Sequence, residues 1–177
     1  VKRVLDAKPN DLFVILNNGL TVLIRESTEN DVVSSQIFVH TGSLYEGEFL
    51  GAGLSHYLEH IVSGGTTRSF SEAEAQERLR KLGGASNAYT TYDRTAYFIN
   101  TSSEHWKESL ELLISYVTEC TLNPQEVERE KAVIQQEFKL GENNPGKEMW
   151  KLFTKTAYHV HPVKHPIIGY EEVFVQQ

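Results

Sequence analysis

The 177-residue sequence has a single cysteine, Cys120, so an internal disulfide framework is excluded. It has no apolar run near the roughly 20 residues that a membrane-spanning helix needs. The 17 basic residues are outnumbered by 24 acidic ones, and the net charge of −7 argues against nucleic acid as a partner. Repeats and low-complexity tracts are absent as well. With 40% hydrophobic residues the chain can bury a core, and we expect a soluble globular protein.

One pentapeptide carries the strongest chemical signal. Residues 56–60 read His-Tyr-Leu-Glu-His, which is H-x-x-E-H, the inversion of the H-E-x-x-H zinc-protease signature. On a helix, His56 and His60 lie one turn apart and can bind one metal ion, while Glu59 remains to handle a proton. The predicted helix has an apolar arc on the opposite side, formed by Leu54, Tyr57, Leu58, Ile61 and Val62.

A catalytic zinc site needs a further protein ligand, and the segment 124–140 offers one. Its proline near the start and its helix formers predict a helix with an apolar arc of Val127, Val133, Ile134, Phe138 and Leu140. Glu130 and Glu137 lie two turns apart and project from within that arc. Buried carboxylates normally pair or bind metal, because an unpaired buried charge is costly. For either residue alone, a partner arginine or a partly exposed helix edge is the favoured alternative, but two in register beside an H-x-x-E-H helix favour metal. We therefore predict Glu137 as the third ligand and Glu130 as a catalytic-site carboxylate that supports the ligands or faces the substrate.

The remaining patterns predict an α+β fold with a mostly antiparallel sheet and helices packed on one face. Strands are expected near 13–16, 20–25, 32–40, 85–90 and 95–100, and further helices near 71–82, 103–119 and 146–157. The hairpin 85–100 has an edge that could bind an extended peptide by strand addition, and Asn87 could contact the peptide backbone. An ordinary hairpin with a polar asparagine is the alternative for this segment.

These motifs together resemble the N-terminal catalytic domain of the pitrilysin/insulinase-type zinc peptidases, a family that includes the β-subunit of the mitochondrial processing peptidase. In that family a glutamate ligand follows H-x-x-E-H at a spacing like that of Glu137 here. Another glutamate stands seven residues earlier, as Glu130 does. Asn87-Ala88-Tyr89 resembles the strand with which the family aligns its peptide substrate.

The resemblance implies a zinc-dependent endopeptidase in which His56, His60 and Glu137 hold Zn²⁺ and Glu59 is the general base. It implies an extended peptide or unfolded polypeptide as substrate, bound through Asn87, Ala88 and Tyr89. It also implies a second homologous domain or subunit that helps to hold the substrate. Residues 1–177 are then expected to be a single catalytic N-terminal domain, truncated at its C-terminal end and without that second half. The bacterial cytoplasm or periplasm is the expected compartment.

Two other functions stay open at this point. The first is a non-catalytic scaffold subunit, like the peptidase-derived core subunits of respiratory complexes, which typically lose parts of the metal motif. The second is a metalloenzyme of the S-ribosylhomocysteine lyase type, which also has an H-x-x-E-H helix but takes a cysteine as its third ligand. Cys120 is the candidate for that ligand, although we expect it to be a small core residue on a helix. For His159, His161 and His165 a proline-rich surface loop is expected, not a second metal site.

Overall fold

The computed structural model describes residues 1–176, and for residues 7 and 8 it describes the backbone alone. The chain divides into two compact units, Val1–Val32 and Val33–Gln177. The smaller unit is an antiparallel sheet with the order β1-β2-β3, formed by β1 (Arg3–Lys8), β2 (Asp11–Ile15) and β3 (Thr21–Arg25). Its second hairpin turns at Gly19, whose φ of +91° suits a residue without a Cβ atom.

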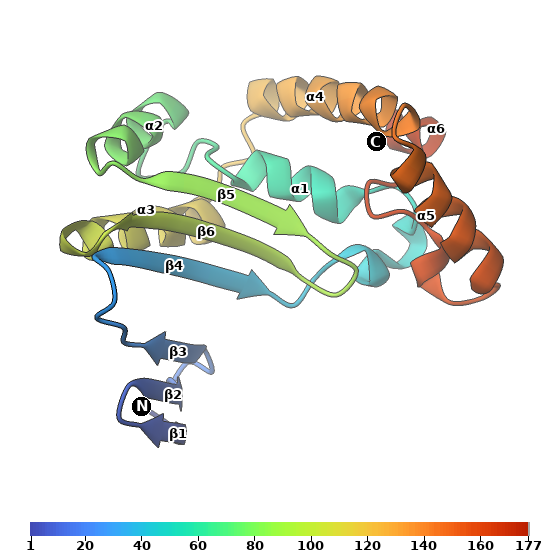
Figure 1. The fold of residues 1–177 in the computed structure, drawn as a ribbon. Coiled ribbons are helices and arrows are strands. Elements are labelled where there is room, and N and C mark those ends of the chain that lie inside the picture. The colour runs from blue at the N-terminus through green and yellow to red at the C-terminus, as the bar shows by residue number, and fades with distance from the viewer. Residues whose placement is uncertain (177) are drawn as a thin grey trace. The chain divides into compact units, whose positions relative to one another are not determined.

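The larger unit contains a three-stranded sheet with the order β4-β6-β5 (Figure 1). Its strands are β4 (Val32–Val39), β5 (Ala85–Thr90) and β6 (Thr95–Ser102), and β5 pairs with β6 in antiparallel register. Its α-helices are α1 (Leu54–Val62), α2 (Glu72–Lys81), α3 (Trp106–Glu119), α4 (Pro124–Glu142), α5 (Pro145–Ala157) and α6 (Glu171–Phe174). None of the helices among residues 1–176 is both long and apolar enough to cross a membrane.

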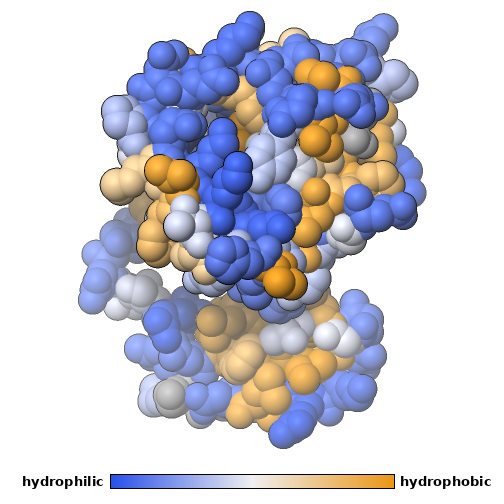
Figure 2. Space-filling model, turned by 90° about the vertical axis from the view of Figure 1, so that its right-hand side faces the viewer, coloured by the Kyte–Doolittle hydropathy of each residue, from blue (hydrophilic) through white to orange (hydrophobic). Residues whose placement is uncertain are grey.

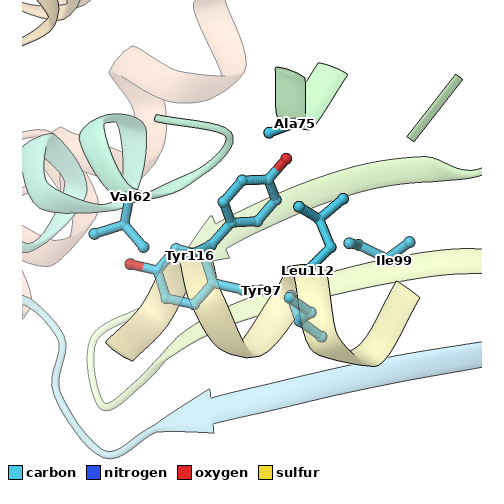
Figure 3. Packing of buried hydrophobic residues seen from close by; sticks show 7 residues of the cluster. Val62, Ala75, Tyr97, Ile99, Leu112 and Tyr116 are labelled. Atoms are coloured by element: carbon cyan, nitrogen blue, oxygen red, sulfur yellow. The ribbon is translucent and has the colours of Figure 1, made fainter. Parts of the chain in front are cut away.

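One hydrophobic core joins three helices to a single face of this sheet (Figure 3). Tyr97 and Ile99 lie two positions apart on β6, so they point to the same face, and both are buried there. The helices α1, α2 and α3 contribute Val62, Ala75, Leu112, Leu113 and Tyr116 to the same cluster. The expected α+β arrangement, with antiparallel pairing and helices on one face, is therefore confirmed.

A second core holds α1 against α4 and α6. It consists of Tyr57, Ile61, Ile134 and Phe174, and the ring of Tyr57 meets that of Phe174 edge-on with centroids 5.1 Å apart. Because α1 and α4 are more than sixty residues apart in sequence, this packing decides which residues of the two helices face each other.

The sequence patterns were wrong in some details. Leu58, Val133 and Leu140 were expected in apolar arcs, but 43%, 36% and 71% of their surface is exposed, whereas other members of the same arcs are buried in the cores. Cys120 lies directly after α3 and not on it, where it pairs with Thr67 in an isolated β-bridge. Strand β1 was not predicted. Its apolar residues Val4 and Leu5 are adjacent and exposed, so alternation gave no signal there.

Candidate metal centre

The N-terminus of α1 is held in place by two neighbouring loops. Gly53 precedes the helix with φ +73°, and a Cβ atom there would lie 2.1 Å from the carbonyl oxygen of Ile168, so only glycine fits. From the other side, Glu46 Oε1 accepts a hydrogen bond from Ser55 N at 2.9 Å. A carboxylate is favourable at this position because it satisfies a free helix N–H and the positive end of the helix dipole.

The register between α1 and α4 is fixed by a hydrogen bond as well as by the core. Tyr57 donates from its hydroxyl to the carbonyl oxygen of Val127 at 2.7 Å. His56 and His60, next to this core on α1, then also face α4. The two predicted carboxylates of α4, Glu130 and Glu137, meet these imidazoles.

Three potential ligand atoms converge between the two helices. His56 Nε2 lies 3.6 Å from Glu137 Oε2, and His60 Nε2 lies 3.7 Å from Glu137 Oε1. One atom from each of these three residues falls within 4.8 Å of the others. Donor atoms bound tetrahedrally about 2.0–2.1 Å from one ion would be about 3.3 Å apart, so small side-chain movements suffice to form a site. Two imidazoles and one carboxylate are also a ligand set typical of catalytic zinc.

The environment of His56 keeps its imidazole neutral. Burial lowers the pKa of His56 to about 4, with further lowering from the charges of His60 and Lys147. A neutral imidazole has a free nitrogen lone pair, so at pH 7 no proton needs to be displaced before a metal binds.

His60 is oriented by a chain of polar side chains that runs to α2. Its Nδ1 atom lies 3.3 Å from Glu130 Oε2, which leaves Nε2 directed at Glu137. Arg129 donates to Glu130 Oε1 at 3.1 Å and binds both carboxylate oxygens of Glu72 at 2.8 and 3.0 Å. A carboxylate on the second nitrogen of a metal-binding histidine fixes the tautomer and ring orientation and raises the basicity of the ligand.

Glu59 is on the same helix but is directed toward the sheet. Its side chain is buried, with 8% of the residue exposed, and Oε2 accepts a hydrogen bond from Thr90 Oγ1 at 2.8 Å. Burial raises the pKa of Glu59, and the hydrogen bond from Thr90 and the charge of His60 oppose that rise only in part. A carboxyl group with a raised pKa beside a metal site is well suited to accept and return a proton.

Two cavities flank this cluster along strand β5. A polar cavity of about 240 Å³ is lined by Glu59 and His60 together with Asn87 and Ala88 of β5. A larger cavity of about 720 Å³ is lined by His56, Glu137 and Thr90. Strand β5 is at the edge of its sheet, since the order β4-β6-β5 gives it one partner strand within the described residues 1–176. Such an edge offers main-chain hydrogen bonds to an extended peptide.

The three β5 residues predicted to bind substrate differ in their positions. Asn87 is exposed and its Oδ1 accepts a hydrogen bond from Ala88 N at 2.8 Å, so the side chain folds back onto its own strand. Ala88 is half-buried beside the polar cavity. Tyr89 is 39% exposed and lines neither of these two cavities.

Several site residues were not found from the sequence. Thr90 ends the strand that was expected to bind substrate, but its contact with Glu59 was not predicted, and Arg129, which contacts Glu130, belongs to no motif or periodic pattern. Glu126 is 8% exposed and accepts hydrogen bonds from the backbone and hydroxyl of Thr66, at 2.9 and 2.5 Å, so it ties the loop after α1 to α4. Its position four residues before Glu130, on the same helix face, was the only available signal. Cys120 does not join the ligand cluster found among residues 1–176 and packs beside both cores.

Comparison with known families identifies one match. The family model described as insulinase (peptidase family M16) matches residues 21–171. A Rickettsia felis protein named as an uncharacterized zinc protease is 32% identical over 154 residues, which are 87% of this chain and 37% of that protein. The rat mitochondrial-processing peptidase subunit beta is 29% identical over 164 residues, covering 91% of this chain and 32% of that subunit.

Solved structures agree with this match. A protease from Helicobacter pylori superposes with a TM-score of 0.86 at 29% identity, covering 96% of this chain and 41% of that one. A domain from Pseudomonas fluorescens, described as a peptidase M16 inactive domain, superposes with a TM-score of 0.81 at 20% identity, which shows the fold alone. The chain thus spans less than half of the length of each of these relatives.

Proposed function

Because the chain belongs to the insulinase family of peptidases (family M16), we propose that it is a zinc-dependent endopeptidase domain. The observation that carries the proposal is the convergence of His56, His60 and Glu137 within 4.8 Å. Glu59 and Glu130 stand beside these ligands with different partners. The Rickettsia felis relative is named as a zinc protease, which supports zinc-dependent peptide hydrolysis here.

Each side chain has a distinct role in this proposal. His56, His60 and Glu137 would hold Zn²⁺, which polarises a peptide carbonyl and lowers the pKa of a water molecule to about 7 when bound. Glu59 takes the proton of the attacking water on its carboxylate and returns it to the amine of the leaving peptide. Thr90 orients that carboxylate through its hydroxyl, and Glu130 orients His60.

The substrate in this proposal is an extended peptide that pairs with the free edge of β5. Main-chain hydrogen bonds along the strand would align it across the metal ligands without regard to sequence. Asn87, Ala88 and Tyr89 are its proposed contacts. The relatives are more than twice as long as this chain, and we propose that a second homologous domain or subunit closes over the peptide.

The two alternative functions receive less support. A scaffold subunit has no need of an intact set of ligands and a general base, whereas all four groups are gathered here. A lyase-type site would require Cys120 among the ligands, but that residue packs against the two hydrophobic cores instead.

Zinc stoichiometry of the purified chain is the experiment that tests the proposal. We expect about one zinc per chain, lost in Glu137→Gln and retained in Glu128→Gln, an exposed glutamate of the same helix. Glu59→Gln should keep the zinc and lose peptide hydrolysis, because the base is removed without a ligand. Absence of zinc from the wild-type chain, or full hydrolysis by Glu59→Gln, would contradict the assignment.

A further inference from the structure

The larger of the two cavities beside the metal ligands has an apolar lining. Phe138, Ile167 and Ile168 are half-buried within it, and Trp150 of α5 lies at its side. The cavity, at about 720 Å³, falls within the range of about 300–1,000 Å³ that is usual for ligand sites. Among residues 1–176, no segment fills it.

Trp150 contacts the turn that follows β5. Its indole Nε1 donates to the hydroxyl of Tyr92 at 3.4 Å, and its ring lies against that of Phe153 with centroids 5.4 Å apart. Yet 54% of Trp150 stays exposed. Figure 2 shows the side of the molecule that contains α5, where apolar side chains interrupt an otherwise hydrophilic surface. Large exposed aromatic side chains beside a cavity are characteristic of binding sites.

The occupant follows from what else lines the cavity. His56, Glu137 and Thr90 form part of the same wall, so the apolar lining is continuous with the proposed metal centre and with the substrate edge. A peptide on that edge must place a side chain there. The rim carries four carboxylates and two lysines, contributed by Glu142, Glu148, Glu171, Glu172, Lys147 and Lys151. The net negative charge of this rim would repel an acidic side chain of the peptide. An apolar side chain would instead contact the apolar lining beneath the rim.

The direction of β5 assigns the cavity to one side of the cleaved bond. Asn87 and Ala88 line the polar cavity, and Thr90, further along the strand, lines the apolar one. A peptide that pairs antiparallel to β5, the commoner and slightly more stable pairing, has its N-terminal part beside Thr90. Its residues before the cleaved bond therefore lie over the apolar cavity.

We propose that this cavity is a specificity subsite for a bulky apolar side chain on the N-terminal side of the cleaved bond, with Trp150 and Phe138 as its determinants. The proposal rests on the proposed zinc peptidase function and adds the class of substrate. The charge of the rim makes lysine or arginine the competing side chain at this position.

Peptide hydroxamates test the subsite without requiring turnover. In an acetyl-Gly-X hydroxamate the terminal group chelates zinc, so the side chain X is held on the N-terminal side of the metal. We expect the zinc-loaded chain to bind the phenylalanine compound about tenfold more tightly than the alanine compound, measured by titration calorimetry. Trp150→Ala should reduce that preference to about threefold or less. Trp106→Ala, which alters the other tryptophan, on α3, should leave it unchanged.

The outcomes separate this proposal from the one on which it rests. Equal affinity for the phenylalanine and alanine compounds, tighter binding of the lysine compound, or a preference unaffected by Trp150→Ala would overturn the apolar subsite and leave the peptidase proposal standing. Failure of all the compounds to bind the zinc-loaded chain would overturn both. The chain could instead self-associate, lose that association in Trp150→Ala and show no preference among the compounds. That result would overturn the subsite and show that the apolar cavity binds a second copy of the chain.

Discussion

Replacing Glu130 by glutamine should weaken zinc binding although Glu130 is not a predicted ligand. Its carboxylate lies 3.3 Å from His60 Nδ1, and 16% of its side chain is exposed, so solvent screens the interaction only in part. A hydrogen bond to a charged group contributes about 1.5–3 kcal/mol, against about 0.5–1.5 kcal/mol for a neutral one. The midpoints of these two ranges differ by about 1.25 kcal/mol, which corresponds to a loss of zinc affinity of about eightfold, close to the lower end of the range of about 10–100-fold found when such supporting residues are replaced.

Competition with a chromogenic chelator at pH 7 measures this loss. Glu128→Gln is the matched control, because Glu128 lies on the same helix, is exposed and makes the same change in net charge. A shift in zinc affinity of less than about twofold for Glu130→Gln, or an equal shift for Glu128→Gln, would refute the orienting role. The thermal stability of both metal-free variants should be compared, since a general loss of fold would affect zinc binding without any specific role of Glu130.

Two further predictions concern the metal-free protein. Burial raises the pKa of Glu59, so its ionised form opposes folding at neutral pH, and Glu59→Gln should raise the melting temperature at pH 7. This advantage should vanish as the pH falls below the ordinary glutamate range, where both the folded and unfolded chains are protonated. A variant that is no more stable at pH 7 would contradict the assigned environment. The pKa of His56 is lowered to about 4 in the folded chain, so as the pH falls this imidazole takes up its proton in the unfolded chain before it does so in the folded one. Stability should therefore decline between about pH 6.5 and 4, by up to about 3 kcal/mol from this residue. Urea denaturation across that range should show a clearly smaller decline for His56→Gln.

The site is better determined by the sequence than the details of the helices that carry it. The spacing of His56, Glu59 and His60 within one helical turn is local, so any helix at this position gives the three side chains their relative arrangement. Likewise, two turns separate Glu130 and Glu137 whatever surrounds α4. The pairing of the two helices was inferred from the cost of unpaired buried carboxylates and from the need for a third ligand, and the family resemblance agreed with it.

Exposure of the apolar arcs was less accurately predicted. Periodicity indicates that one side of a helix is apolar, but not how much of that side its neighbours cover, and Leu58 and Leu140 remain exposed. Glu59 shows the opposite case. It belongs to the polar arc of α1, yet it is buried because β5 packs over it and Thr90 satisfies its carboxylate.

By itself the sequence determined the α+β class, the H-x-x-E-H pentapeptide and the two carboxylates of α4, because these depend on residue patterns and on spacing along a single element. Tertiary structure decided the rest. The core of Tyr57, Ile61, Ile134 and Phe174 sets α1 against α4 and brings His60 within reach of Glu130 and Glu137. Tertiary packing also brought Glu72 to Arg129 and placed His56 and Trp150 in the lining of one cavity, from segments distant in the chain. Contacts of this kind depend on the packing of helices against each other, which no local pattern of residues records.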